Sequence, residues 1–254
     1  MSEQIYIHEG YFESFQKAGK ENSGFSSSRW LNAQQQYLES VINLHWNSQY
    51  PIDQNLAMLL AVLGKNRTNA FKVLDIGGGL GATYHWLKQV LNTDIAIDLY
   101  QIVELPAVVE AIKNNPELAG QNEAENDSLY FSEYIPELKF DIVNYGSSLH
   151  YFEDWKDQLM EIILSAPMAF SFSRTPVSEK GSYVTLQNYY ESRIPVWVFG
   201  LEDLTKFFSE QGYKLVYKGV SCSPVLGKLG AIPVRNIPQE YQIRYFSDLV
   251  FMRN

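Results

Sequence analysis

The sequence has little of what marks secreted or membrane-spanning proteins. It contains one cysteine, Cys222, which excludes an internal disulfide and favours a reducing compartment. Its longest uninterrupted apolar run, residues 56–63, is far shorter than the ~20 residues that span a bilayer. The first residues carry no basic and apolar targeting signal. These absences predict a cytoplasmic protein without a membrane span.

Positive charge and metal ligands are also scarce. The chain has 20 lysines and arginines against 29 acidic residues, a net charge of −9, so it shows no electrostatic footprint for nucleic acid. Its 4 histidines are scattered, without the His-x-x-x-His or paired-cysteine spacing of zinc sites. We therefore expect no bound metal and no nucleic-acid partner.

The sequence does contain a glycine-rich turn between an apolar strand and a helix. Residues 71–76 predict the strand, Gly78 lies within a turn of four glycines, and a helix begins near Ala82. Glycine is needed where the chain turns through positive φ and where backbone must approach a ligand closely. Because this turn opens onto a helix N-terminus, it predicts a nucleotide-type ligand at the carboxyl edge of a parallel sheet.

Two patterns overlap in this turn. Gly77, Gly79 and Ala82 fit a dinucleotide fingerprint, so an NAD(P) site is one alternative, and a purely structural turn is another. Asp75, at the mouth of the strand, would repel a pyrophosphate but suits a ligand with an amino group and a sulfonium. With Gly81 included, the stretch resembles the first motif of class I methyltransferases, Asp/Glu-x-Gly-x-Gly-x-Gly. The resemblance implies S-adenosylmethionine (SAM) as cofactor and S-adenosylhomocysteine (SAH) as product.

After the glycine turn, strand and helix patterns alternate along the chain. Further strands are predicted at 95–103, 129–131, 140–145, 167–173, 213–220 and 248–252, and helices at 107–112, 155–164 and 201–211. Such alternation is typical of a doubly wound α/β fold with a mostly parallel sheet. The order fits a seven-stranded methyltransferase sheet whose last strand is inserted antiparallel. Residues 174–198 read as a long functional connection.

The first 70 residues differ from the rest and predict a helical segment. Apolar residues recur at helical spacing over 30–45, and Asp53 is suited to cap a second helix that ends at Gly64. We interpret 1–70 as a cap on the SAM-binding domain, 71–254, and a lid formed by the polar loop 19–28 is the sharper alternative. Its apolar helices also suggest a homodimer contact.

Glu104 is the best candidate for the ribose of an adenosyl group. It ends the second predicted strand, where an acid can accept hydrogen bonds from both ribose hydroxyls, and Leu105 follows it beside the ligand. Asp98 is the alternative candidate, but the alternation of apolar residues around it places it in the middle of the strand.

Polar residues close the next two strands as well. Ser132 and Glu133 stand where class I methyltransferases place a polar residue against the adenine amine, and the pattern leaves open which of them faces the ligand. Asn144 and Tyr145 end the fourth strand and are expected to border the methionine moiety. These four assignments follow from position alone.

Catalytic and substrate candidates follow the fourth and fifth strands. His150 is the candidate general base, because a histidine near its reference pKa can take a proton from an attacking hydroxyl or amine. A histidine that only lines the pocket is the alternative. Tyr151 is expected to contact the substrate, and Arg174 to hold an acidic substrate group through its bidentate fork or to form an internal salt bridge.

The chain as a whole is similar to a bacterial family of class I methyltransferases associated with surface-polysaccharide gene clusters. The resemblance rests on residues 14–18, 24–25, 73–81, 103–106, 147–151, 172–176 and 248–251. It implies methyl transfer to an oxygen or nitrogen of a small-molecule acceptor, and suggests a saccharide-linked one. An NAD(P)-dependent oxidoreductase and a non-catalytic adenosyl-binding protein remain as alternatives.

Overall fold

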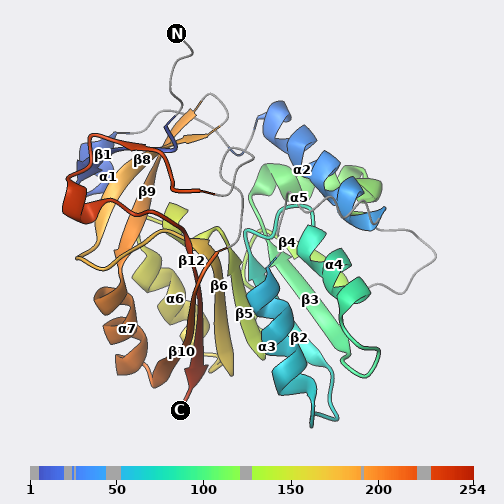
Figure 1. The fold of residues 1–254 in the computed structure, drawn as a ribbon. Coiled ribbons are helices and arrows are strands. Elements are labelled where there is room, and N and C mark those ends of the chain that lie inside the picture. The colour runs from blue at the N-terminus through green and yellow to red at the C-terminus, as the bar shows by residue number, and fades with distance from the viewer. Residues whose placement is uncertain are drawn as a thin grey trace.

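A seven-stranded sheet forms the centre of the computed structural model (Figure 1), which describes residues 6–19, 25, 27–43, 53–120, 128–189, 192–221 and 230–254. The strand order is β10-β12-β6-β5-β2-β3-β4, and β12 runs antiparallel to the other six strands. The predicted fold class is therefore confirmed. The strands are β2 (Phe71–Ile76), β3 (Ile97–Val103), β4 (Leu129–Ser132), β5 (Ile142–Gly146), β6 (Ala169–Thr175), β10 (Tyr213–Val220) and β12 (Ser247–Arg253).

Helices cover both faces of this sheet, and the strands are apolar on both sides for that reason. In β2, Phe71 and Val73 pack into one core cluster, while Leu74 and Ile76 pack into another. The first cluster includes side chains of α3 (Gln54–Gly64) and α4 (Ala82–Val90), and the second those of α6 (Trp155–Ile163) and α7 (Leu201–Glu210). Burial on both faces is what the continuous apolar runs of a parallel sheet indicate.

A second, smaller sheet was not predicted. It has the order β11-β1-β8-β9-β7 and combines β1 (His8–Phe12) with β7 (Val177–Ser178), β8 (Tyr183–Tyr189), β9 (Ser192–Gly200) and β11 (Val234–Arg235). The stretch 174–198, predicted as a long functional connection, contains strands, because β8 and β9 form an antiparallel pair. The strands were missed because polar and aromatic residues, together with Pro195, interrupt the alternation of apolar and polar residues that is typical of a strand.

The N-terminal segment contains a strand as well as helices. After β1 come α1 (Phe15–Ala18), α2 (Ser28–Ile42) and α3, and the backbone N–H of Trp30 donates to Ser27 Oγ at the start of α2. The prediction of a wholly helical segment missed β1. Most of the proposed lid, 20–24 and 26, lies outside the described residues.

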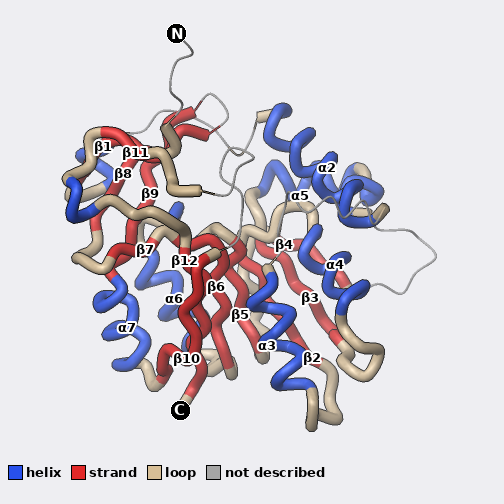
Figure 2. The backbone as a smooth tube through the Cα atoms, in the orientation of Figure 1, coloured by secondary structure: helices blue, strands red, loops and turns tan. Residues whose placement is uncertain are grey.

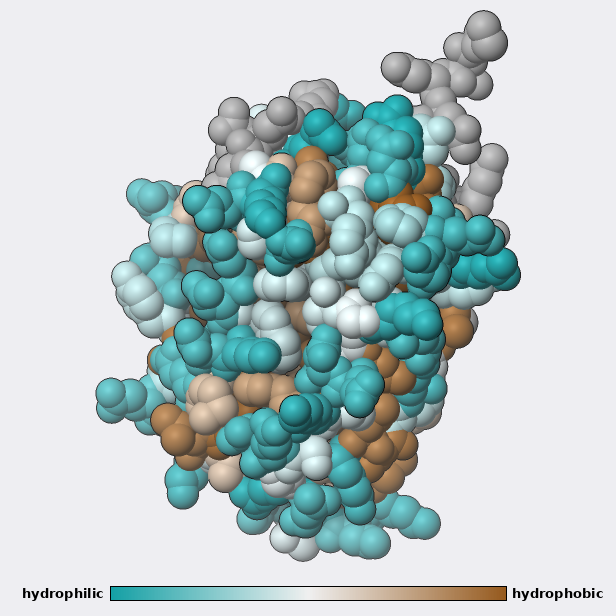
Figure 3. Space-filling model, turned by 90° about the vertical axis from the view of Figure 1, so that its left-hand side faces the viewer, coloured by the Kyte–Doolittle hydropathy of each residue, from teal (hydrophilic) through white to brown (hydrophobic). Residues whose placement is uncertain are grey.

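The second sheet and α2 stand near the carboxyl ends of the parallel strands (Figure 2), which is where ligands bind in open α/β sheets. The face in Figure 3 is largely hydrophilic, with apolar residues in separate groups. Among the helices described, none is long and apolar enough to cross a membrane.

Candidate active site

A cavity of about 1490 Å³ lies at the carboxyl ends of β2, β3 and β5. It exceeds the ~300–1,000 Å³ of a typical small-molecule site, so it has room for two ligands. Nine of the residues singled out from the sequence line it: Asp75, Gly77, Gly78, Gly79, Glu104, Leu105, Glu133, Tyr151 and Arg174. Five do not line it: Gly81, Ser132, Asn144, Tyr145 and His150.

The glycine turn is bare because side chains would not fit. Gly77 and Gly79 have φ of 72° and 61°, and a Cβ on Gly77 would lie 2.7 Å from Ser148 Cβ. The carboxylate of Glu104 braces the turn, since Gly79 N–H donates to Oε1 at 2.9 Å and Leu105 N–H donates to Oε2 at 2.8 Å. Burial raises the pKa of Glu104, and these two hydrogen bonds oppose the shift.

Asp75 is buried at the end of β2, and each of its carboxylate oxygens accepts a hydrogen bond. Tyr100 Oη donates to its Oδ2 at 2.7 Å, and Asn144 Nδ2 donates to its Oδ1 at 2.9 Å. Burial raises the pKa of Asp75 to about 7, and the nearby charge of Asp53 acts in the same direction. Asn144 therefore supports the carboxylate from beneath the cavity surface rather than lining the cavity.

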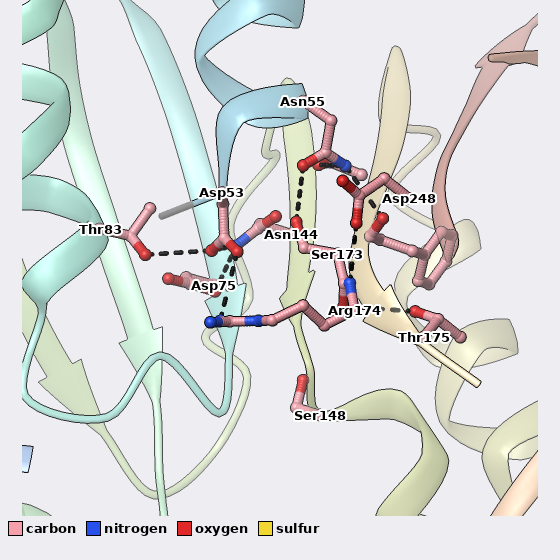
Figure 4. Close-up of polar contacts among 12 residues, drawn as sticks. Asp53, Asn55, Asp75, Thr83, Asn144, Ser148, Ser173, Arg174, Thr175 and Asp248 are labelled. Atoms are coloured by element: carbon pink, nitrogen blue, oxygen red, sulfur yellow. Dashed lines mark hydrogen bonds and ion pairs between the residues drawn. The ribbon is translucent and has the colours of Figure 1, made fainter. Parts of the chain in front are cut away.

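Asp53 is the site residue that sequence reasoning missed. It precedes α3 as predicted, but its side chain makes no capping hydrogen bond. Instead its Oδ2 accepts from Thr83 Oγ1 at 3.0 Å and from Asn144 Nδ2 at 3.2 Å, while its buried Oδ1 accepts no hydrogen bond (Figure 4). An aspartate before a helix is an ordinary cap signal, so the sequence gives no local sign of this second role.

Arg174 enters the cavity through an irregularity in β6. Two residues of β6, Ser173 and Arg174, stand opposite the single Asp248 of β12, and Arg174 has a φ of 50°. Its backbone N–H donates to Asp248 Oδ1 at 2.9 Å. From this bulge its guanidinium extends toward Asp53 (Figure 4), where Nη2 lies 3.6 Å from Oδ1. Bulges re-aim side chains in this way next to functional sites.

Two residues predicted at the site are buried elsewhere. Tyr145 is fully buried and stacks on Phe172, with ring centroids 5.5 Å apart, so it belongs to the core rather than to the methionine subsite. His150 is 2% exposed, and burial, aided by the neighbouring His8, lowers its pKa to about 3. A sealed imidazole with so low a pKa is a weak base, so the geometry does not favour His150 as the general base.

The structure separates Ser132 from Glu133. Ser132 Oγ donates to the carbonyl of Tyr134 at 2.6 Å and accepts from Gln101 Nε2, so its hydroxyl is engaged inside the protein. Glu133 lines the cavity and pairs with Lys113 at 3.7 Å. Gly81 lies outside the lining and precedes α4 as its N-cap residue, with a φ of 87°. Of the two adenine candidates, only Glu133 reaches the cavity.

The N-terminal segment and the second sheet also contribute residues to the cavity lining. We call these residues the outer wall, and they are Phe15, Phe25, Trp30, Tyr37, Gln187, Tyr189, Ile194 and Pro195. Tyr151 joins it, since its hydroxyl donates to Gln187 Oε1 at 3.0 Å. The outer wall is aromatic and uncharged.

Comparison with known proteins identifies the fold. A scan against protein-family models finds no match, and a search of curated proteins finds no similar sequence. Magnesium protoporphyrin IX methyltransferase (ChlM) from Synechocystis PCC 6803 with bound SAH is similar, with a TM-score of 0.55 and 13% identity over 91% of this chain and 97% of that chain. The glycopeptide N-methyltransferase MtfA complexed with SAM has a TM-score of 0.50 and 11% identity, over 80% and 94% of the two chains. The chain has the fold of class I SAM-dependent methyltransferases.

Proposed function

We propose that this protein transfers a methyl group from SAM to an oxygen or nitrogen of a small molecule. One observation carries the proposal: the bare glycine turn, braced by Glu104, opens beside the buried carboxylates of Asp53 and Asp75 in one cavity. SAM, when bound, supplies a methyl group activated by its sulfonium. Orienting the acceptor against that group can contribute ~7–11 kcal/mol to lowering the barrier.

The cavity residues fit the parts of SAM. Asp53 and Asp75 offer carboxylates to its ammonium, and the buried Asp53 Oδ1 still lacks a hydrogen bond. Glu104 and Glu133 both line the cavity. We assign Glu104 to the ribose hydroxyls and Glu133 to the adenine. The same two aspartates would repel the pyrophosphate of NAD(P), so they count against the oxidoreductase alternative.

Several finer predictions stay as proposals. They are the saccharide-linked acceptor, the cytoplasmic location, the homodimer, and the division at residue 70. A catalytic role for His150 also stays a prediction, although its burial favours a structural role.

The test is calorimetric titration with SAH, with NAD⁺ titrated in parallel. We expect micromolar binding of SAH and none of NAD⁺. Glu104→Ala should weaken SAH by about tenfold or more, because hydrogen bonds to charged groups are worth ~1.5–3 kcal/mol. Glu137→Ala is the matched control, since Glu137 is exposed on a loop outside the cavity.

Binding of NAD⁺ in place of SAH would overturn the methyltransferase proposal. Equal SAH affinities for the Glu104 and Glu137 variants would mean that Glu104 does not bind the ribose. The proposal of a SAM site would then rest on Asp53 and Asp75.

A further inference from the structure

We propose that Gln34 of α2 binds the ribose of the cofactor and that this contact holds α2 over the glycine turn. The inference rests on the proposed methyltransferase function and adds a cofactor-binding residue to the same cavity. It starts from a polar side chain on the apolar face of a helix.

The packed face of α2 contains one polar residue. Trp30, Leu38 and Val41 are buried in the core cluster that α2 shares with α4, and their spacing places them on one side of the helix. Gln34 lies on the same side, four residues after Trp30 and four before Leu38. Packing by itself favours an apolar residue there, and such a conflict with the local pattern is typical of a functional position.

The side chain of Gln34 lies against the glycine turn. A Cβ on Gly79 would be 3.0 Å from Gln34 Oε1 and 3.8 Å from its Cδ, so the bare α-carbon of this glycine makes room for α2. The N–H of the same glycine donates to Glu104 Oε1 at 2.9 Å. Gln34 and Glu104 therefore meet at one residue of the turn, and both line the cavity.

The amide of Gln34 has no hydrogen-bond partner among the described residues. Its oxygen is the atom closest to Gly79, while Nε2 lies more than 4 Å from the same point. The two N–H donors of Nε2 are therefore not used by the turn. A donor that faces a ligand cavity and is not needed by the fold is suited to bind the ligand.

A ribose requires the donor that Gln34 supplies. Each ribose hydroxyl donates one hydrogen bond and can also accept, whereas a charged carboxylate such as that of Glu104 can only accept. An amide N–H close to Glu104 completes the set, because it donates to the hydroxyl oxygens. The carboxylate of the cofactor also accepts hydrogen bonds, but Glu104 would repel it from this position. The ribose is the part of the cofactor that suits both residues.

The same helix connects the cofactor to the outer wall. Trp30 and Tyr37 of α2 belong to that wall, and the ring of Trp30 meets that of Phe25 edge-on, with centroids 6.0 Å apart. α2 thus borders both the glycine turn and the aromatic part of the cavity. A ribose held by Gln34 fixes the helix, and with it this part of the outer wall.

The test is calorimetric titration of the full chain with SAH and with 5′-methylthioadenosine, which has the ribose and adenine of SAH without its amino acid. Gln34→Leu should weaken both ligands by about three- to tenfold, which is the effect of losing one neutral hydrogen bond. The same variant should be as stable as the wild type or more stable in urea denaturation, because leucine suits the packed face of α2.

Gln35→Leu is the matched control. Gln35 is the next residue of the same helix, donates to Glu39 Oε1 at 3.2 Å and does not line the cavity, so its loss should leave SAH affinity unchanged. Gln34→Glu keeps the length of the side chain but replaces the donor with an acceptor close to Glu104. It should weaken SAH at least as much as Gln34→Leu does.

Hydrogen exchange measures the effect on the helix. SAH should slow the exchange of the backbone amides of α2 in the wild-type protein and in Gln35→Leu, and should slow it less in Gln34→Leu at equal saturation. Exchange in α2 that SAH does not change would overturn the proposal that the cofactor holds this helix.

The remaining outcomes separate this inference from the proposed function. Failure of SAH to bind the wild-type protein would overturn both. If SAH binds, equal affinities for Gln34→Leu and Gln35→Leu would overturn the role of Gln34 alone. A loss confined to SAH, with 5′-methylthioadenosine unaffected, would assign Gln34 to the amino acid of the cofactor and overturn its assignment to the ribose.

Discussion

Two buried carboxylates share one amide at the centre of the site. Asn144 Nδ2 donates to Asp75 at 2.9 Å and to Asp53 at 3.2 Å. The arrangement holds two like charges close together, which is costly unless a cation joins them. Burial raises the pKa of Asp75 to about 7, and the charge of Asp53 adds to that shift. An ammonium at this position would relieve it.

The affinity for SAH should therefore depend on pH through Asp75. Its carboxyl is neutral below a pKa of about 7 and charged above it, and only the charged form attracts an ammonium. Between pH 6 and pH 8 the charged fraction rises about tenfold, so affinity should rise by roughly fivefold to tenfold. Calorimetry at the two pH values measures this.

Asp75→Asn should flatten that dependence. Asp98→Asn serves as the control, because Asp98 is exposed on β3 and lies outside the cavity. If the Asp75 and Asp98 variants kept the same slope, another group would be responsible for it.

At the scale of elements, two buried histidines influence each other, one in the second sheet and one in the turn that follows β5. His8 of β1 and His150 of the short turn Leu149–Tyr151 are both almost fully buried, and both ring nitrogens of His8 lack hydrogen bonds. Burial lowers the pKa of His8 to about 4 and that of His150 to about 3. The turn that carries His150 also carries Tyr151 at the cavity, so its packing supports the site.

Acid should destabilise the packing around both histidines. The folded-state pKa of each histidine lies below its unfolded value of 6.5, so their stabilising effect is complete above pH 6.5 and is lost as pH falls toward 3–4. Between pH 7 and pH 5 each contributes a loss of about 2 kcal/mol in the free energy of unfolding, as an upper bound. His150→Gln, which carries no titrating ring, should reduce the total loss by that amount in urea denaturation.

The loss must be measured as a difference between His150→Gln and the wild-type protein, because Asp75 changes the free energy of unfolding with pH in the opposite direction. Its raised pKa gives stability that is complete below pH 4 and is lost as pH rises through about 7. Taking the difference between the two proteins cancels this contribution. If the free energies of unfolding of the wild-type and His150→Gln proteins fell in parallel as the pH was lowered, His150 would be protonated within the folded protein.

At the scale of the whole molecule, chain segments far apart in sequence close one cavity. The N-terminal helices, the strand ends of the main sheet and the β8–β9 pair all contribute lining residues. The N-terminal segment is also joined to the sheet, since Asn55 Nδ2 donates to the carbonyl of Phe172 at 2.9 Å and Ser173 Oγ donates back to Asn55 at 2.6 Å. Ligand bound between these parts should stabilise the protein as a unit.

SAH at about 100 times its dissociation constant should add ~2.7 kcal/mol to the free energy of unfolding. For a chain of this size that corresponds to a rise in Tm of roughly 5–10 °C. Differential scanning calorimetry measures the shift, and Gly77→Ala, whose Cβ would lie 2.7 Å from Ser148 Cβ, should lose most of it. An equal shift in that variant would place SAH away from the glycine turn.

The sequence by itself determined the features that depend on neighbours along the chain. The strands of the main sheet, the glycine turn with the helix after it, and Glu104 at the end of β3 follow from local periodicity and turn chemistry. The tertiary structure decided which side chains meet. Asp53 and Asn144 are 91 residues apart, and a single bulge against Asp248 turns Arg174 into the cavity. Burial, equally non-local, placed Tyr145 and His150 in the interior. Contacts of this kind arise from packing between distant segments, and no short stretch of sequence contains them.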